Sequence, residues 1–85
     1  MTRLWPGGEP IEAWGEQEIP DGFYWHYVPQ RILEVCNRWR IHTNWWESEQ
    51  MVWRKYWKVV TATGMLCLIY HDLQAAKWFL ARVYD

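Results

Sequence analysis

Basic and aromatic residues alternate in the middle of this sequence, and their types and spacing are the ones best suited to chemistry. The pattern occurs at Arg38–Arg40 (RWR) and at Trp53–Lys58 (WRKYWK), with a tryptophan pair at Trp45–Trp46 between them. Such surfaces can bind single-stranded nucleic acid, because cations follow the phosphates while aromatic faces stack on the bases. We therefore predict contacts to nucleic acid, or to another partner, from seven residues: Arg38, Arg40, Trp45, Trp46, Arg54, Lys55 and Lys58.

A purely structural interpretation of the same pattern stays open. A strand at Trp53–Lys58 would place its odd-numbered residues on one side and its even-numbered residues, two cations around a tyrosine, on the other. In a short chain, tryptophan is an efficient core filler, and the stems of Arg and Lys can lie over its ring. Trp45 and Trp46 are the exception, because adjacent side chains of an extended segment point to opposite sides, so one of them is expected to be exposed.

Residues typical of catalytic or metal sites do not form a known pattern. The three histidines are isolated from one another and from both cysteines, without the spacing of a zinc site. The pair Gly7-Gly8 lacks the lysine and the following helix of a phosphate-binding loop. Glu47 and Glu49 could act as acid and base, but they are typical of an exposed loop. We therefore expect a protein that is not an enzyme and that has no metal and no cofactor.

The size and composition of the chain predict one small domain. Its 85 residues are 51% hydrophobic, and nine Trp, five Tyr and two Phe supply large rings that can fill a core. We expect residues 1–85 to form a single domain, with 10–85 as the β core and 1–9 as an N-terminal arm that can be flexible. The apolar stretches are far shorter than the ~20 residues of a membrane-spanning helix, so we expect a cytoplasmic protein without membrane contact.

Charge distribution and cysteine usage each leave two alternatives open. Residues 1–22 carry one base against five acids, whereas residues 31–58 carry six bases against three acids. This asymmetry either steers an anionic partner to the middle of the chain or pairs the acidic segment with basic strands of the same molecule. We interpret Cys36 and Cys67 as buried, reduced thiols, with a single disulfide between neighbouring strands as the alternative.

Composition and turn residues predict a mainly β domain. Residues that favour strands dominate, and helix signals are sparse. Turns are expected at Val28–Gln30, because proline pre-sets φ for a turn, and at Ala62–Gly64, because glycine can take the positive φ of a hairpin. Five to six short strands joined by hairpins favour an antiparallel meander curled into a small barrel of SH3-like or similar type. The predicted strands are 11–15, 23–27, 31–41, 53–61, 65–71 and 78–84.

Several segments resemble an uncharacterised bacterial domain family. These segments are Ile19–Trp25, Glu34–Arg40, Trp45–Glu47, Tyr56–Val59 and Trp78–Asp85. The family occurs as small standalone proteins, and similar sequence closes the chain of ImuB-like inactive relatives of Y-family DNA polymerases, which act in error-prone repair synthesis. The resemblance implies strands in the C-terminal half and a DNA-repair context, and it transfers no catalytic or binding residue. Where relatives have a short polar turn before the last strand, this chain has Leu73–Lys77 (LQAAK), at which a short helical turn can form.

Two functional hypotheses follow from these observations. The first is a non-catalytic β module that binds single-stranded nucleic acid weakly, or assists a DNA-repair assembly, through the seven residues above. The second is a protein-interaction or self-association module that contacts no nucleic acid and is anchored by Trp46 and neighbouring rings. The near-neutral net charge of −1 favours the second hypothesis. The expected partners are therefore single-stranded nucleic acid, a DNA-repair protein or a second copy of the chain.

Overall fold

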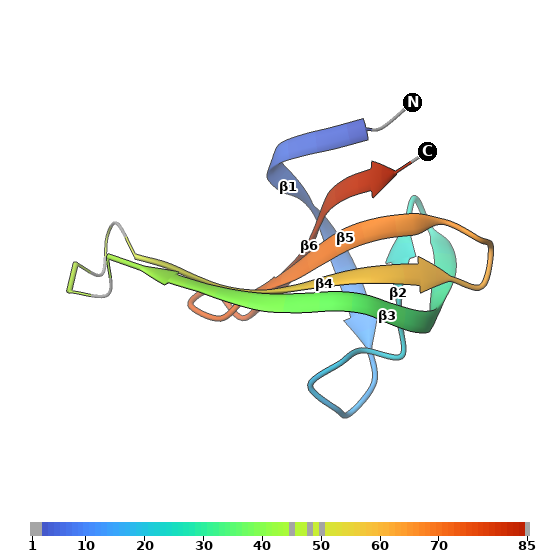
Figure 1. Ribbon diagram of the computed structural model, residues 1–85, viewed down its shortest axis with the longest axis horizontal. Coiled ribbons are helices and arrows are strands. Elements are labelled where there is room, and N and C mark those ends of the chain that lie inside the picture. Colours follow the sequence, from blue (N-terminus) through green and yellow to red (C-terminus); the bar gives the residue numbers. More distant parts are fainter. Residues whose placement is uncertain (1–2, 45, 48, 50, 85) are drawn as a thin grey trace.

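Six antiparallel strands make up the fold (Figure 1). The computed structural model describes residues 3–44, 46–47, 49 and 51–84. The strands form a closed barrel in chain order, in which β1 also pairs with β6. Their bounds are β1 (Arg3–Trp14), β2 (Gly22–Trp25), β3 (Val28–Thr43), β4 (Val52–Thr61), β5 (Leu66–Asp72) and β6 (Lys77–Tyr84). The prediction of a mainly β meander closed into a small barrel is confirmed.

The turn between β2 and β3 differs from the prediction. It consists of His26 and Tyr27, whose φ angles are 50° and 64°, and not of Val28–Gln30. Two residues with positive φ form the kind of turn whose twist matches that of the flanking strands. Because the ring of Pro29 fixes its φ near −65°, this proline cannot occupy such a turn. It lies in β3 instead, opposite Tyr24.

The other hairpin turns follow local chemistry that is visible in the sequence. The predicted turn at Ala62–Gly64 is confirmed: Gly64 has a φ of 84°, and its N–H donates to the carbonyl of Thr61. Between β5 and β6 the chain makes a turn and not a helix. The Asp72 carboxylate accepts hydrogen bonds from the backbone N–H groups of Gln74 and Ala75, both at 3.1 Å. This Asx-type capping supplies partners to two backbone groups without helix formation.

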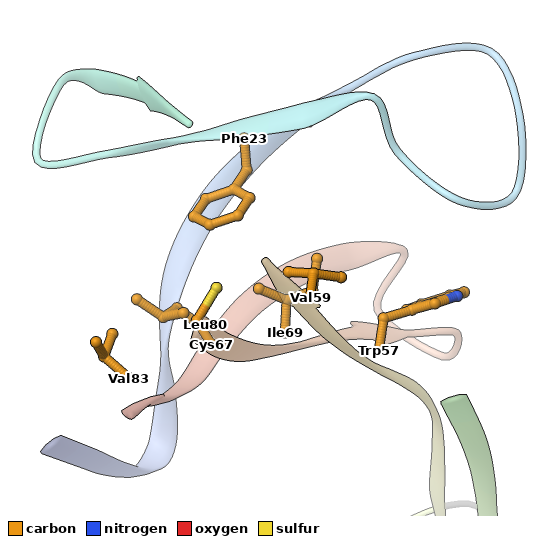
Figure 2. Packing of buried hydrophobic residues seen from close by; sticks show 7 residues of the cluster. All are labelled: Phe23, Trp57, Val59, Cys67, Ile69, Leu80 and Val83. Atoms are coloured by element: carbon orange, nitrogen blue, oxygen red, sulfur yellow. The ribbon is translucent and has the colours of Figure 1, made fainter. Parts of the chain in front are cut away.

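The hydrophobic core fills the barrel between β2, β4, β5 and β6 (Figure 2). Its members are Phe23, Trp57, Val59, Cys67, Ile69, Leu80 and Val83. Trp57 is the one tryptophan of this cluster, and Figure 2 shows it at one end of the group. Trp39, Trp46 and Trp53, by contrast, are 38%, 65% and 39% exposed. The core-filling interpretation therefore holds for Trp57 but not for these three rings.

The two cysteines differ in their surroundings. Both are free thiols, so the disulfide alternative does not apply. Cys67 is buried, as predicted, but the prediction that Cys36 is buried is wrong, because Cys36 is exposed on β3. Burial raises the pKa of the Cys67 thiol to about 12, because a thiolate would lose its hydration there. In the described part of the chain, no helix has the length and apolar character needed to cross a membrane.

The β3–β4 hairpin extends beyond the rest of the barrel (Figure 1). β2 pairs with β3 only over Val28–Arg31, whereas β4 pairs with β3 as far as Thr43. We call residues 37–43 and 52–58 the arm. Its inner face continues the surface that carries Trp57 into the core, and its outer face is the opposite one. Apart from Trp57, which belongs to the core, the arm therefore presents two different surfaces.

Candidate functional site

Three cations share the inner face of the arm. Arg38 lies opposite Trp57 in the strand register, and Arg40 lies opposite Lys55. Directly opposed residues of an antiparallel pair project from the same face of the sheet. Because Trp57 marks one end of the buried cluster (Figure 2), these cations begin where the core ends. Three of the seven predicted contact residues are thus brought together.

A hollow of about 440 Å³ opens beside these cations. Its lining consists, within the arm, of Arg38, Trp39, Arg40, Lys55, Tyr56 and Trp57 and, from outside the arm, of Glu18. Arg38 and Arg40 are exposed, and Lys55 is half-buried. A surface of this composition can attract an anionic group and place an aromatic ring beside it.

Glu18 reaches this hollow from the loop at residues 15–21, which joins β1 to β2. Its carboxylate forms an ion pair with the ammonium group of Lys55. The pKa of Glu18 is lowered, mainly by the hydrogen bond and charge of Lys55, and further by the charges of Arg40 and Arg38. This contact supports the alternative in which the acidic N-terminal segment pairs with the basic strands of the same molecule.

A second hollow, of about 280 Å³, is also bordered by that ion pair. Glu18 and Lys55 line it together with Trp14, His71 and Trp78. The rings of His71 and Trp78 are stacked, with centroids 4.5 Å apart and planes 4° from parallel. The pKa of His71 is lowered, mainly by burial and also by the charge of Lys55, which favours a neutral imidazole. This hollow therefore combines a stacked pair of rings with the Glu18–Lys55 ion pair.

The remaining predicted cations lie on the outer face of the arm. Arg54 and Lys58 alternate with Lys55 along β4, as the strand pattern predicts. The guanidinium of Arg54 lies 4.6 Å from the centroid of the Tyr70 ring and donates a 3.3 Å hydrogen bond to the Tyr56 hydroxyl. The ammonium of Lys58 lies 4.8 Å from the centroid of the Tyr84 ring. Rings of the protein itself thus engage both cations.

The predicted tryptophan pair is described only in part. Trp46 lies in the connection between β3 and β4 and is 65% exposed, whereas Trp45 lies outside the described residues. Two further exposed rings were absent from the predicted set: Trp53, which stacks on His42 at 5.1 Å, and Trp39, which stacks on Tyr56 at 5.3 Å. Their alternation with the predicted cations was the available signal.

An acidic and aromatic region lies away from the arm. A hollow of about 610 Å³ is lined by Glu9, Glu12, Tyr24 and Tyr27 among others. The Glu9 carboxylate accepts a 2.9 Å hydrogen bond from the Trp25 indole and lies 3.1 Å from the His26 ring. Within the described residues, no group of three or more His, Cys, Asp or Glu side chains could hold a metal ion.

The chain belongs to a family described as a domain of unknown function (DUF6504), whose model matches residues 7–85. No curated protein and no solved structure matches the chain. The prediction of an uncharacterised domain family is confirmed, while the similarity to polymerase relatives stays a prediction.

Proposed function

We propose that this domain is a non-catalytic module that binds single-stranded nucleic acid along the inner face of its arm. The proposal is supported by the convergence of Arg38, Arg40 and Lys55 around one open hollow, whose lining also includes Trp39, which is 38% exposed. Cations can follow the phosphates of a flexible strand, and unstacked bases can lie on aromatic faces. Trp53, on the same face and 39% exposed, is placed to take part.

The arm suits a single strand better than a duplex. Its cations and rings are interleaved on one sheet face, so a ligand must offer phosphates and base faces side by side. A duplex stacks its bases inside and offers mainly phosphates and base edges. A strand with unstacked bases offers both groups, which matches the pairing of Arg40 with Lys55 on the same face as the exposed Trp53.

The biological context of the proposal is DNA repair. It rests on the resemblance to the C-terminal end of inactive Y-family polymerase relatives, and it makes the domain an accessory to a repair assembly. Single-stranded DNA is exposed during repair synthesis, so a weak contact to it would suit such an accessory. The domain itself would carry out no reaction.

A fluorescence titration tests this proposal. The nine tryptophans make the assay label-free, and a short oligothymidylate is titrated at low and then at physiological salt. We expect saturable quenching that weakens as salt rises, because bound phosphates release counterions. The substitution Arg40→Glu should weaken affinity by about tenfold, which corresponds to about 1.4 kcal/mol.

The matched control is Lys58→Glu, the same kind of charge reversal on the outer face of the arm. Because Lys58 lies over the ring of Tyr84 and away from the hollow, affinity should change by less than about twofold. Unfolding curves of both variants must first establish that they are folded. Binding that ignores salt, or equal losses in the two variants, would contradict the proposal.

A second candidate function, protein interaction, is favoured by a separate observation. Large side chains are exposed at the β2–β3 hairpin: Tyr27 is 100% exposed, Val28 50% and Tyr24 48%, and the two tyrosines line the same hollow. Exposed apolar groups near one another are typical of interaction surfaces. Sedimentation analysis tests self-association: a dimer lost in Tyr27→Ser would support it, and a monomer at all concentrations would count against it.

A further inference from the structure

Glu18 lies among the three cations of the inner face, Arg38, Arg40 and Lys55. Glu18 pairs with Lys55, 37 residues away in sequence, and it lines the same hollow as Arg38 and Arg40. Their charges contribute to the lowered pKa of the Glu18 carboxyl group. The Glu18 carboxylate therefore occupies the position beside Lys55 that a phosphate of the proposed ligand would take.

The ion pair borders two hollows. Glu18 and Lys55 are the residues common to the linings of the 440 Å³ hollow and the 280 Å³ hollow. The first contains Arg38 and Arg40, and the second contains the stacked rings of His71 and Trp78. If Glu18 moved away from Lys55, the cationic and the aromatic surfaces would form one continuous groove.

The loop that carries Glu18 is fixed at its base and exposed at its tip. The backbone N–H of Asp21 donates to the carbonyl of Trp14 at 2.8 Å, and Ile32 donates to Asp21 at 2.9 Å. Residues 15–18 between these anchors are exposed. The Glu18 side chain is 63% exposed and the Lys55 side chain 21%, and an ion pair with one well-exposed partner is a weak restraint. Movement of residues 15–18 need not displace Ile19, which packs against the core, or the buried Pro20.

We propose that Glu18 is an internal competitor for the phosphate of a single-stranded ligand. On binding, a phosphate replaces the Glu18 carboxylate at Lys55, the tip of the loop moves away, and the two hollows join. This inference rests on the function proposed above and adds a regulatory element to the same site. Contacts of Lys55 are exchanged in this step, and no covalent bond changes.

The test compares Glu18→Gln with Glu16→Gln. Glu16 lies on the same exposed loop, lines neither of the two hollows, and gives the same change in net charge. With oligothymidylate at low salt, Glu18→Gln should tighten binding by about three- to fivefold, the size expected when a competing exposed ion pair is removed. Glu16→Gln should change affinity by less than about twofold.

The salt dependence gives a readout that a structural role of Glu18 would not change. In the wild-type protein the Glu18 carboxylate released from Lys55 attracts cations again, which offsets part of the counterion release from the bound phosphates. Glu18→Gln has no such offset, so its slope of log affinity against log salt should be steeper than that of the wild-type protein. In nuclear magnetic resonance spectra, the chemical shifts of the Trp14 and Trp78 indole N–H groups should change when oligonucleotide is added. We expect this in the wild-type protein and in Glu18→Gln, because the joined groove includes both tryptophans.

The outcomes separate this inference from the proposed function. If the wild-type protein binds in a salt-dependent manner but Glu18→Gln binds no more tightly than Glu16→Gln, the competitor role is wrong and the proposed function stands. If neither the wild-type protein nor Glu18→Gln binds oligothymidylate at low salt, both are wrong. Binding by Glu18→Gln alone would support both, since Glu18 would then block the site completely.

Discussion

The two faces of the arm are built from the same residue types but use them differently. On the outer face, Arg54 lies over the ring of Tyr70 and donates to the hydroxyl of Tyr56. On the inner face, Arg38 and Arg40 border an open hollow, and Lys55 holds Glu18 from a separate loop. The outer cations therefore serve the protein's own packing, while the inner cations border space that a ligand can enter.

The difference follows from what each face meets. The outer face continues across β5 and β6 as a row of rings, in which Tyr70 contacts Tyr56 and Phe79 with centroid distances of 5.0 and 5.1 Å. A cation beside such a row lies over an electron-rich ring face. On the inner face, Trp57 belongs to the core, and Lys55 of the same face lines two hollows together with residues of the loop at 15–21. An alternating sequence is thus divided into a packed side and an open side.

The largest expected effect concerns one ring from each face. Tyr70 is 3% exposed in the outer row, whereas Trp53 is 39% exposed on the inner face. Tyr70→Ala should lower the free energy of unfolding by about 3–5 kcal/mol, because it removes a buried aromatic side chain. Trp53→Ala should lower it by about 1 kcal/mol, the value of an exposed ring pair. Urea unfolding followed by circular dichroism measures both free energies. Equal losses would show that the outer and inner rings contribute alike to stability.

The next effect concerns the pH dependence of stability that the buried core residue Cys67 causes. Burial raises the pKa of Cys67 to about 12, so the native thiol stays protonated at a pH where the unfolded chain ionises. The stabilisation is complete below pH 9, the ordinary value, and is lost as the pH rises toward 12. The free energy of unfolding should fall above pH 9 by up to about 1.4 kcal/mol per pH unit for this one group.

The control for that measurement is Cys67→Ala. Tyr70, whose pKa burial also raises, contributes to the pH dependence of both proteins in the same direction. Unfolding at a series of pH values should therefore give a shallower decline for the variant than for the wild-type protein. Parallel declines would mean that Cys67 is hydrated in the native state.

The smallest expected effects come from exchanging one cation of each face for methionine, which keeps the apolar stem. Arg54→Met should lower the free energy of unfolding by about 1 kcal/mol, because a cation–ring contact and a hydrogen bond are lost. Oligonucleotide affinity should stay unchanged. Arg38→Met should leave the unfolding free energy within about 0.5 kcal/mol and reduce the affinity. A variant that shifted both quantities equally would erase the distinction between the two faces.

Local patterns were sufficient to predict most of the strands. All six predicted strand segments overlap observed strands, and the glycine of the turn at Ala62–Gly64 adopts the expected positive φ. The failure at Val28–Gln30 has a local cause: proline was interpreted as a turn residue, but the turn consists of two residues with positive φ that proline cannot adopt. The burial assigned to Cys36 failed because composition does not tell which side of a bulged strand faces the core.

The candidate site was predictable only as a list of residue types. Alternation along β4 correctly separated Lys55 from Arg54 and Lys58, but it could not tell which side would be packed. Nor could it place Glu18, because the charge asymmetry indicated an acidic partner for the basic strands without naming the residue. Such pairing depends on loop geometry and on the closure of β1 against β6.

From its sequence alone, this chain can be assigned its strands and the alternation of cations and rings along them. Periodicity and turn chemistry act over a few neighbouring residues, so they are visible in a linear chain. Tertiary structure alone decided that Arg38, Arg40 and Lys55 meet on one face, that Arg54 and Lys58 are engaged by tyrosines, and that Glu18 reaches Lys55. These contacts join strands and loops far apart in sequence, and register and barrel closure fix them.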